Sequence, residues 1–254
     1  MRRLLLVLLA AALLLGGAFV LLAPASLLAA RVERATGGML AAGQVEGTVW
    51  RGRGVLAAGG TQLPIAWTLD PEPLLHGELR AHIGPFDGVG RVPRADVLAE
   101  RDRLSLRDVD LTLPLPLAIE ALVGRLAHGV GLVAEGDLTI RSAQLDWVPA
   151  TVNGDLEIVW RAARFSLPTY APIDLGEVTA TLVANGERLA GPVRNSGGVM
   201  DIGGEITVHP DRSAAISLLL TPRRTDDATL ARALATVGTA EGGGWRVNWQ
   251  TPPR

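Results

Sequence analysis

From residue 40 onward, apolar and polar residues alternate along the chain with a period of two. In the stretch from Leu63 to Asp70, for example, every second residue is large and apolar. The same alternation recurs later in the chain, at residues 79–83, 155–162 and 245–249. Successive side chains of a strand point to opposite faces, so this pattern predicts antiparallel strands with one buried and one solvated face.

Short glycine-containing pairs separate these stretches and predict hairpin turns. They are Asn153-Gly154, Asn185-Gly186 and Gly197-Gly198. Near Ser142 the apolar residues switch from even to odd positions, which predicts a bulge or a bend in a strand. We therefore predict a mainly β protein with one long curved antiparallel sheet of about ten strands.

Two stretches follow a helical period instead. The residues Leu115–Ala127 and Asp227–Val237 place apolar side chains on one helical face, which predicts one or two short helices beside the sheet. The residues Leu27–Ala35 predict a further short helix that ends at Gly37 and Gly38.

The N-terminal region is an uninterrupted apolar segment. Residues 4–30 carry no charge, and Leu4–Ala23 alone is long enough, at about 1.5 Å per residue, to cross the hydrocarbon core of a membrane. Arg2 and Arg3 precede it, which indicates that the short N-terminal end stays in the cytoplasm.

These features predict a cytoplasmic tip at residues 1–3, a transmembrane anchor at 4–30 and a periplasmic β-rich domain at 31–254 in the cell inner membrane. Residues 4–23 would contact membrane lipid. A cleaved signal peptide is the alternative, but its apolar region is normally about 7–15 residues, which is shorter than this one.

Composition excludes several classes of function. The net charge is −2 over 254 residues, so there is no basic surface that would favour nucleic acid as a partner. The chain has no cysteine, which excludes disulfides, thiolate metal sites and a cysteine nucleophile.

No arrangement of residues in the sequence indicates an active site. The four histidines are scattered without a metal-binding spacing: His76, His82, His128 and His209. Paired carboxylates occur without catalytic context, at Asp108 with Asp110 and at Asp226 with Asp227. The first pair is expected on one solvated strand face. We therefore predict no catalytic, cofactor-binding or metal-binding residue, and no enzyme activity.

Two motif blocks resemble the family of type II secretion system protein N. The first, Gly43–Gly52, matches that family's GTxWxG signature at Gly47, Thr48, Trp50 and Gly52. The second, Leu63–Pro71, carries a central Trp67 and then Pro71, and continues through Leu74 and Leu75 to Gly77. We expect structural roles for these residues: glycines that permit tight backbone, and Trp50 plugging an end of the sheet.

The resemblance implies an accessory inner-membrane subunit of the apparatus that moves folded proteins from the periplasm across the outer membrane. Its partners would be other subunits, in the inner-membrane platform or the pseudopilus. The sheet is also similar to the groove-forming sheets of AsmA-type envelope proteins, so a second hypothesis is that it binds lipid or another hydrophobic ligand. An anchored periplasmic hydrolase is a third hypothesis.

Overall fold

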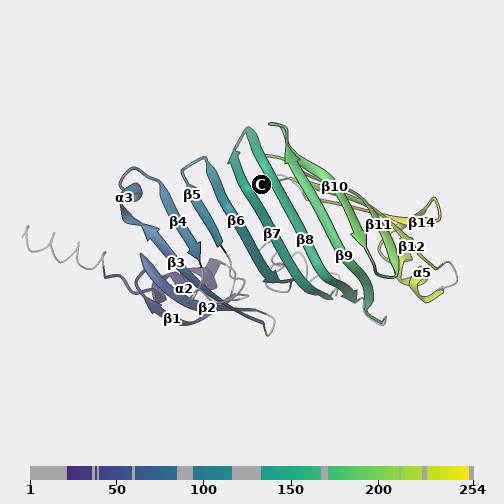
Figure 1. Cartoon of the computed structure of the whole chain (residues 1–254), viewed down its shortest axis with the longest axis horizontal. Coiled ribbons are helices and arrows are strands. Elements are labelled where there is room, and N and C mark those ends of the chain that lie inside the picture. Colours follow the sequence, from purple (N-terminus) through teal and green to yellow (C-terminus); the bar gives the residue numbers. More distant parts are fainter. Residues whose placement is uncertain are drawn as a thin grey trace, which may run out of the picture.

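The computed structural model describes residues 22–35, 38, 40–58, 61–84, 94–115, 133–166, 171–211, 213–224 and 228–251. These residues form one open sheet in which all neighbouring strands are antiparallel. Strands β1 to β12 lie side by side in chain order, followed by β14 and then β13. Figure 1 shows them arranged along the long axis of the molecule with a progressive twist.

The strands are β1 Ala41–Gly47, β2 Arg51–Ala58, β3 Thr61–Asp70, β4 Leu79–Gly84, β5 Arg94–Ala99, β6 Leu104–Pro114, β7 Val133–Val148, β8 Thr151–Ser166, β9 Ile173–Ala184, β10 Leu189–Ser196, β11 Met200–Val208, β12 Ala214–Pro222, β13 Thr239–Glu241 and β14 Gly244–Thr251. A mainly β fold built on one long open antiparallel sheet is therefore confirmed.

The described helices are short: α2 Ser26–Ala35, α3 Pro71–Leu74 and α5 Ala228–Ala235. Two of them confirm predicted helices, α2 near residues 27–35 and α5 near residues 227–237. Beyond α2, Gly38 has a positive φ of 81° and donates its N–H to the Glu33 carbonyl, as the predicted glycine end requires. Of the predicted helix at residues 115–127, only Leu115 lies within the described residues.

One face of the sheet, here called the apolar face, is built by cross-strand pairing of apolar residues. A single row crosses the sheet from β6 to β14 through Leu111, Ile140, Ile158, Ala180, Val193, Gly204, Leu218 and Val247. The helix α5 covers one end of this face with Leu230, Ala233 and Leu234. The helix α2 covers the other end, where Val32 packs against Leu40 and Leu63 (Figure 1).

Asn195 is a polar residue on the apolar face. Its Nδ2 donates to the carbonyls of Leu175 and Met200 at 2.8 and 2.9 Å, and its Oδ1 accepts the N–H of Ile202 at 2.7 Å. Burying a side-chain amide is unfavourable unless its N–H and C=O groups form hydrogen bonds. Because the partners of Asn195 lie on β9 and β11, these bonds fix the ends of β9, β10 and β11 relative to one another.

The opposite face is polar and carries ion pairs across neighbouring strands. Arg141 on β7 lies 3.5 Å from both Asp110 on β6 and Glu157 on β8. Exposed pairs of this kind each contribute at most about 1 kcal/mol to stability. They still favour the observed register, because a shift by one residue would bring these charges to the apolar face.

The predicted irregularity near Ser142 is confirmed as a bulge. Between Arg141 and Leu145, β7 carries one more residue than the facing part of β8. The extra residue changes which positions point inward, so the apolar positions move from even to odd numbers along β7.

One predicted hairpin turn is wrong. Asn153-Gly154 lies inside β8, and the turn between β7 and β8 falls at residues 149–150. Gly154 has a φ of 117° and its backbone approaches Leu145 across the bulge, so its glycine signal comes from the bulge and not from a turn. The predicted turns at Asn185-Gly186 and Gly197-Gly198 are confirmed.

The predicted number of about ten strands is also wrong, because the described residues form fourteen. Several of the fourteen strands have little alternation to reveal them. β1 and β2 are rich in glycine, alanine and arginine, and β13 is three exposed residues long.

No helix within the described residues is long and apolar enough to cross a membrane. Most of the predicted anchor, residues 4–21, lies outside the described part of the chain, so the transmembrane helix stays a prediction. The predicted boundary between residues 30 and 31 falls inside α2, which packs on the sheet.

The apolar face predicts contrasting effects of substitution at two adjacent positions of β9. Leu182 is 1% exposed and Val183, which points to the polar face, is 59% exposed. We expect Leu182→Ala to lower the free energy of unfolding by about 2–5 kcal/mol, because it leaves a cavity in the core. Val183→Ala should cost less than about 1 kcal/mol. Denaturant unfolding followed by circular dichroism measures both, and equal effects would contradict the assigned faces.

Candidate functional site

The signature residues form a tight hairpin between β1 and β2. The N–H of Thr48 donates to the Arg51 carbonyl at 2.9 Å, and the N–H of Arg51 donates back to Thr48 Oγ1 at 3.2 Å. Gly47 has a φ of 95°, and a Cβ there would collide with the backbone of Arg51 and Gly52. The position therefore requires glycine.

This signature hairpin also holds residues 23–25, which belong to the last part of the predicted anchor at residues 4–30. The N–H of Val49 donates to the Ala23 carbonyl at 2.8 Å, and the N–H of Ala25 donates to the Gly47 carbonyl at 3.1 Å. Ala25 is buried beneath the hairpin. Residues 23–25 thus pair with residues 47–49, and the direction in which the chain enters the sheet is fixed by backbone hydrogen bonds.

Trp67 on the neighbouring strand β3 packs against the hairpin and donates a hydrogen bond to it. Its Nε1 donates to the Val49 carbonyl at 3.0 Å, and its indole ring lies against Gly52, where a Cβ would overlap the ring. Trp50 lies half-buried at the hairpin turn, and its carbonyl accepts the N–H of Leu69 at 2.7 Å. The two signature tryptophans therefore connect the hairpin to β3.

The other two signature residues shape the connection between β3 and β4. Pro71 begins α3 and Gly77, with a φ of 80°, follows its end. Within this connection the N–H groups of Leu75 and His76 donate to the carbonyls of Glu72 and Pro73 at 3.1 and 2.9 Å. The connection is a compact, hydrogen-bonded turn.

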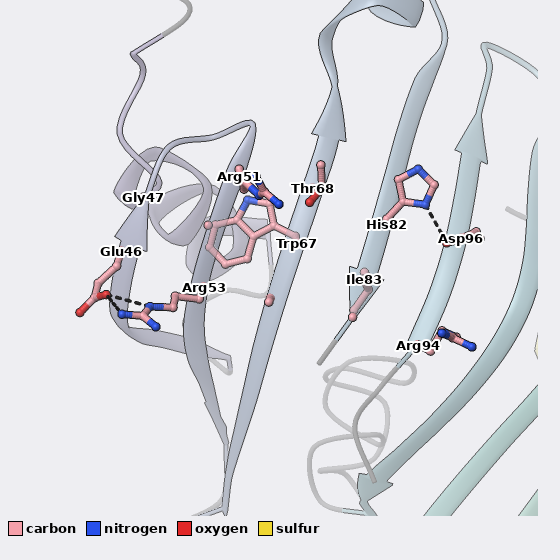
Figure 2. Close-up of a pocket in the computed structure, with 13 residues that line it drawn as sticks. Glu46, Gly47, Arg51, Arg53, Trp67, Thr68, His82, Ile83, Arg94 and Asp96 are labelled. Carbon is pink, nitrogen blue, oxygen red and sulfur yellow. Dashed lines mark hydrogen bonds and ion pairs between the residues drawn. The ribbon is translucent and has the colours of Figure 1, made fainter. Parts of the chain in front are cut away.

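A charged cleft opens beside the hairpin, with a volume of about 660 Å³. Its charged lining residues are Glu46, Arg51, Arg53, His82, Arg94 and Asp96. Figure 2 shows two pairs among them, with Arg53 binding Glu46 at 2.7 Å and His82 binding Asp96 at 2.7 Å. These groups offer ion pairs and hydrogen bonds to a charged surface.

His82 is held between two carboxylates. The hydrogen bond from its ring to Asp96 raises the pKa of His82 above its ordinary value, and the negative charge of Asp70, 3.6 Å from Nε2, adds to the effect. Desolvation opposes the shift without cancelling it. His82 on β4 therefore links β3 and β5 through its contacts with Asp70 and Asp96.

The remaining histidines and acidic pairs do not gather into a site. His76 lies in the turn after α3 and His209 lies after β11, while His128 is outside the described residues. Within the part of the chain that the structure describes, no three metal-binding side chains converge.

The two acidic pairs are also separate from the hairpin. Asp110 is exposed beside Arg141, whereas Asp108, also exposed, has a φ of 46° in a bulge of β6 that interrupts the expected alternation. Asp226 and Asp227 fall outside the described residues.

One polar cluster was missed by the sequence reasoning. Asp146 on β7 accepts hydrogen bonds from Ser105 Oγ at 2.6 Å, Gln144 Nε2 at 2.7 Å and Arg107 at 3.1 Å. These donors, Ser105 first, hold the pKa of Asp146 below its ordinary value. No local sequence motif predicts this cluster, because Ser105 and Asp146 are distant in the chain and become neighbours through the register of β6 and β7.

Fold and hairpin together define a protein with a single open antiparallel sheet and an N-terminal segment paired with its first hairpin. The family profile described as "Type II secretion system (T2SS), protein N" matches residues 39–248. The chain belongs to this family, which confirms the resemblance seen in the two motif blocks. No curated protein and no solved structure matches the chain.

Membership makes the chain a component of the type II secretion system, which acts in protein transport across the cell envelope. It also implies interaction with other components of that system. The matched region begins just before β1 and ends within β14, so it includes the signature hairpin and nearly the whole described sheet.

The contact between Gly52 and Trp67 predicts a specific defect. We expect Gly52→Ala to lower the free energy of unfolding by about 1–3 kcal/mol, because the new methyl group would overlap the indole and approach the Glu46 carbonyl. Gly43→Ala on β1 is the matched control, since a Cβ there meets nothing within 4 Å, and its effect should stay within about 0.5 kcal/mol.

A double-mutant cycle identifies the cause. In a Trp67→Leu background the cost of Gly52→Ala should fall, because the main obstacle has been removed. An unchanged cost would show that the indole does not require glycine at this position.

The contact between His82 and Asp96 predicts a pH effect. The folded pKa of His82 is raised, so its contribution to stability is full below the ordinary value of about 6.5 and is lost as the pH rises through the raised pKa. The effect is small, because the side chains are half-exposed and solvent screens their charges.

Nuclear magnetic resonance titration of the histidine rings measures this pKa directly. Asp96→Asn should bring the pKa of His82 back toward its ordinary value, whereas Asp110→Asn, which removes a carboxylate that pairs with Arg141, should leave it unchanged. Equal titration curves for the wild-type chain and Asp96→Asn would refute the assigned cause.

Proposed function

We propose that the chain is an accessory inner-membrane subunit of the type II secretion system that supports export of folded proteins from the periplasm across the outer membrane. The match to protein N over residues 39–248 is the observation that carries this function. In this topology residues 1–3 are cytoplasmic, one apolar segment crosses the membrane, and the sheet lies in the periplasm.

The sequence and the hairpin support this topology. Residues 4–23 are apolar over a length that suits a bilayer, with Arg2 and Arg3 before them. The backbone then pairs at once with the signature hairpin through Ala23 and Ala25. A transmembrane segment ending there would be joined to the sheet without a flexible linker.

We infer a structural role in the secretion apparatus and no enzymatic one. The signature residues Gly47, Thr48, Gly52 and Trp67 are engaged in building the hairpin, where they support backbone geometry. The sheet therefore suits the task of presenting a surface to other subunits, in the inner-membrane platform or the pseudopilus. The alternative of an AsmA-like groove for lipid or another hydrophobic ligand gains no support from the family match.

Deleting the gene tests the function. Proteins normally exported by the system should accumulate in the periplasm of the deletion strain, and the full-length gene should restore their export. A variant in which a cleavable signal peptide replaces residues 1–21 should restore export poorly, because the sheet would no longer be tethered to the membrane.

Two controls make the result interpretable. A fusion of alkaline phosphatase to the C-terminus should be active if the sheet is periplasmic, and the intact chain should resist extraction of membranes by alkaline carbonate. Normal export in the deletion strain would exclude a role in secretion, whatever the topology.

A further inference from the structure

The turn that follows β3 exposes two adjacent leucines. Leu75 is 84% exposed and Leu74 is 40% exposed, and among the large apolar side chains of the described residues only Leu22, at 72%, approaches Leu75. Scattered surface leucines are ordinary, but two neighbours at the tip of one short turn form a local apolar projection.

This projection is held rigidly. Pro71 and Pro73 restrict the backbone of α3, and the N–H of Gly77 donates to the Leu74 carbonyl at 3.1 Å. The N–H of Glu78 closes the turn on Pro73 at 3.0 Å. The backbone that carries Leu75 is therefore already ordered, so contact with a partner would require little further ordering of this turn.

The projection lies at the same end of the sheet as the point where the N-terminal segment enters. The N–H of Val49 donates to the Ala23 carbonyl, and the N–H of Leu69 donates to the Trp50 carbonyl. Leu69 lies two residues before Pro71, so the hairpin and the turn after β3 are close together. In an antiparallel sheet of consecutive strands, the turns after odd-numbered strands share one end, here called the signature end. Figure 1 shows α3 at the tip of β3.

Further apolar side chains extend this surface along the signature end. Leu79 on β4 pairs through Ala99 on β5 with Leu104 on β6, and both leucines are exposed. Together with Leu74 and Leu75 they form a set of exposed leucines at the signature end, here called the apolar margin, which lies beside the charged turn of residues 100–103.

We propose that this margin, led by Leu74 and Leu75, is a second membrane contact that enters the boundary between lipid headgroups and acyl chains next to the transmembrane segment. Residues 4–23 are apolar and long enough to span a bilayer, and they end at the signature hairpin, so the lipid surface would lie beside this end of the sheet. Leucines at that depth are favourable because their surface leaves water. The contact depends on the anchored topology proposed above.

The absence of cysteine allows a direct test on the full-length chain. Leu75→Cys carries a polarity-sensitive fluorophore, and the chain is reconstituted into vesicles of phosphatidylethanolamine and phosphatidylglycerol. The matched control is Val199→Cys, because Val199 is also an exposed apolar residue, at 44%, but lies in the turn after β10 at the opposite end of the sheet.

We expect the fluorophore at position 75 to shift its emission to the blue and to be quenched by lipids that carry a spin label near the headgroup. The fluorophore at position 199 should be quenched by iodide in the water and not by these lipids. Equal quenching by iodide at both positions would overturn the membrane contact. Protection from iodide without quenching by lipid would also overturn it, since protein and not lipid would then cover the turn.

An alkaline wash of the same vesicles distinguishes a failure of the second membrane contact from a failure of the proposed topology. A chain that resists the wash while position 75 stays in water is anchored without the second contact, so only the contact fails. A chain that the wash removes lacks the anchor, and both the topology and the contact fail together.

Discussion

The structure depends on burying one face of a very long sheet. Each strand alone could bury little, but antiparallel pairing aligns the apolar residues of neighbours such as Ile140 and Ile158 into rows that cross the sheet. A change of register by one residue would turn a whole strand's apolar residues to the solvent. The bulges are therefore necessary, because they keep the apolar residues of long strands such as β7 on the same face as those of both neighbours while the sheet twists.

The sequence predicts those features whose cause lies within a single strand or helix. Alternation located β3, β4, β8 and β14, and the phase change near Ser142 located a bulge. It was uninformative where the cause lies in another strand. Asn153-Gly154 has the chemistry of a turn, yet Gly154 is required by its close approach to β7, which only the register reveals.

The same reason explains what could be predicted of the candidate site. The signature block marked Gly47 and Gly52 as special, and the structure gives each a steric reason. Pairing of Ala23 and Ala25 with the hairpin leaves no mark in the sequence, because backbone hydrogen bonds do not depend on the identity of the side chains. The cluster around Asp146 was missed for a related reason, since its members are distant in the chain.

The order of the strands also bears on how the protein is made. From β1 to β12 each strand lies beside the one synthesised just before it, joined for the most part by short turns. Such a sheet can grow by one strand at a time as the chain is synthesised, without waiting for distant segments. Among the described strands this order changes at the end of the chain alone, where β14 lies between β12 and β13, so the last edge of the sheet is formed by the final hairpin.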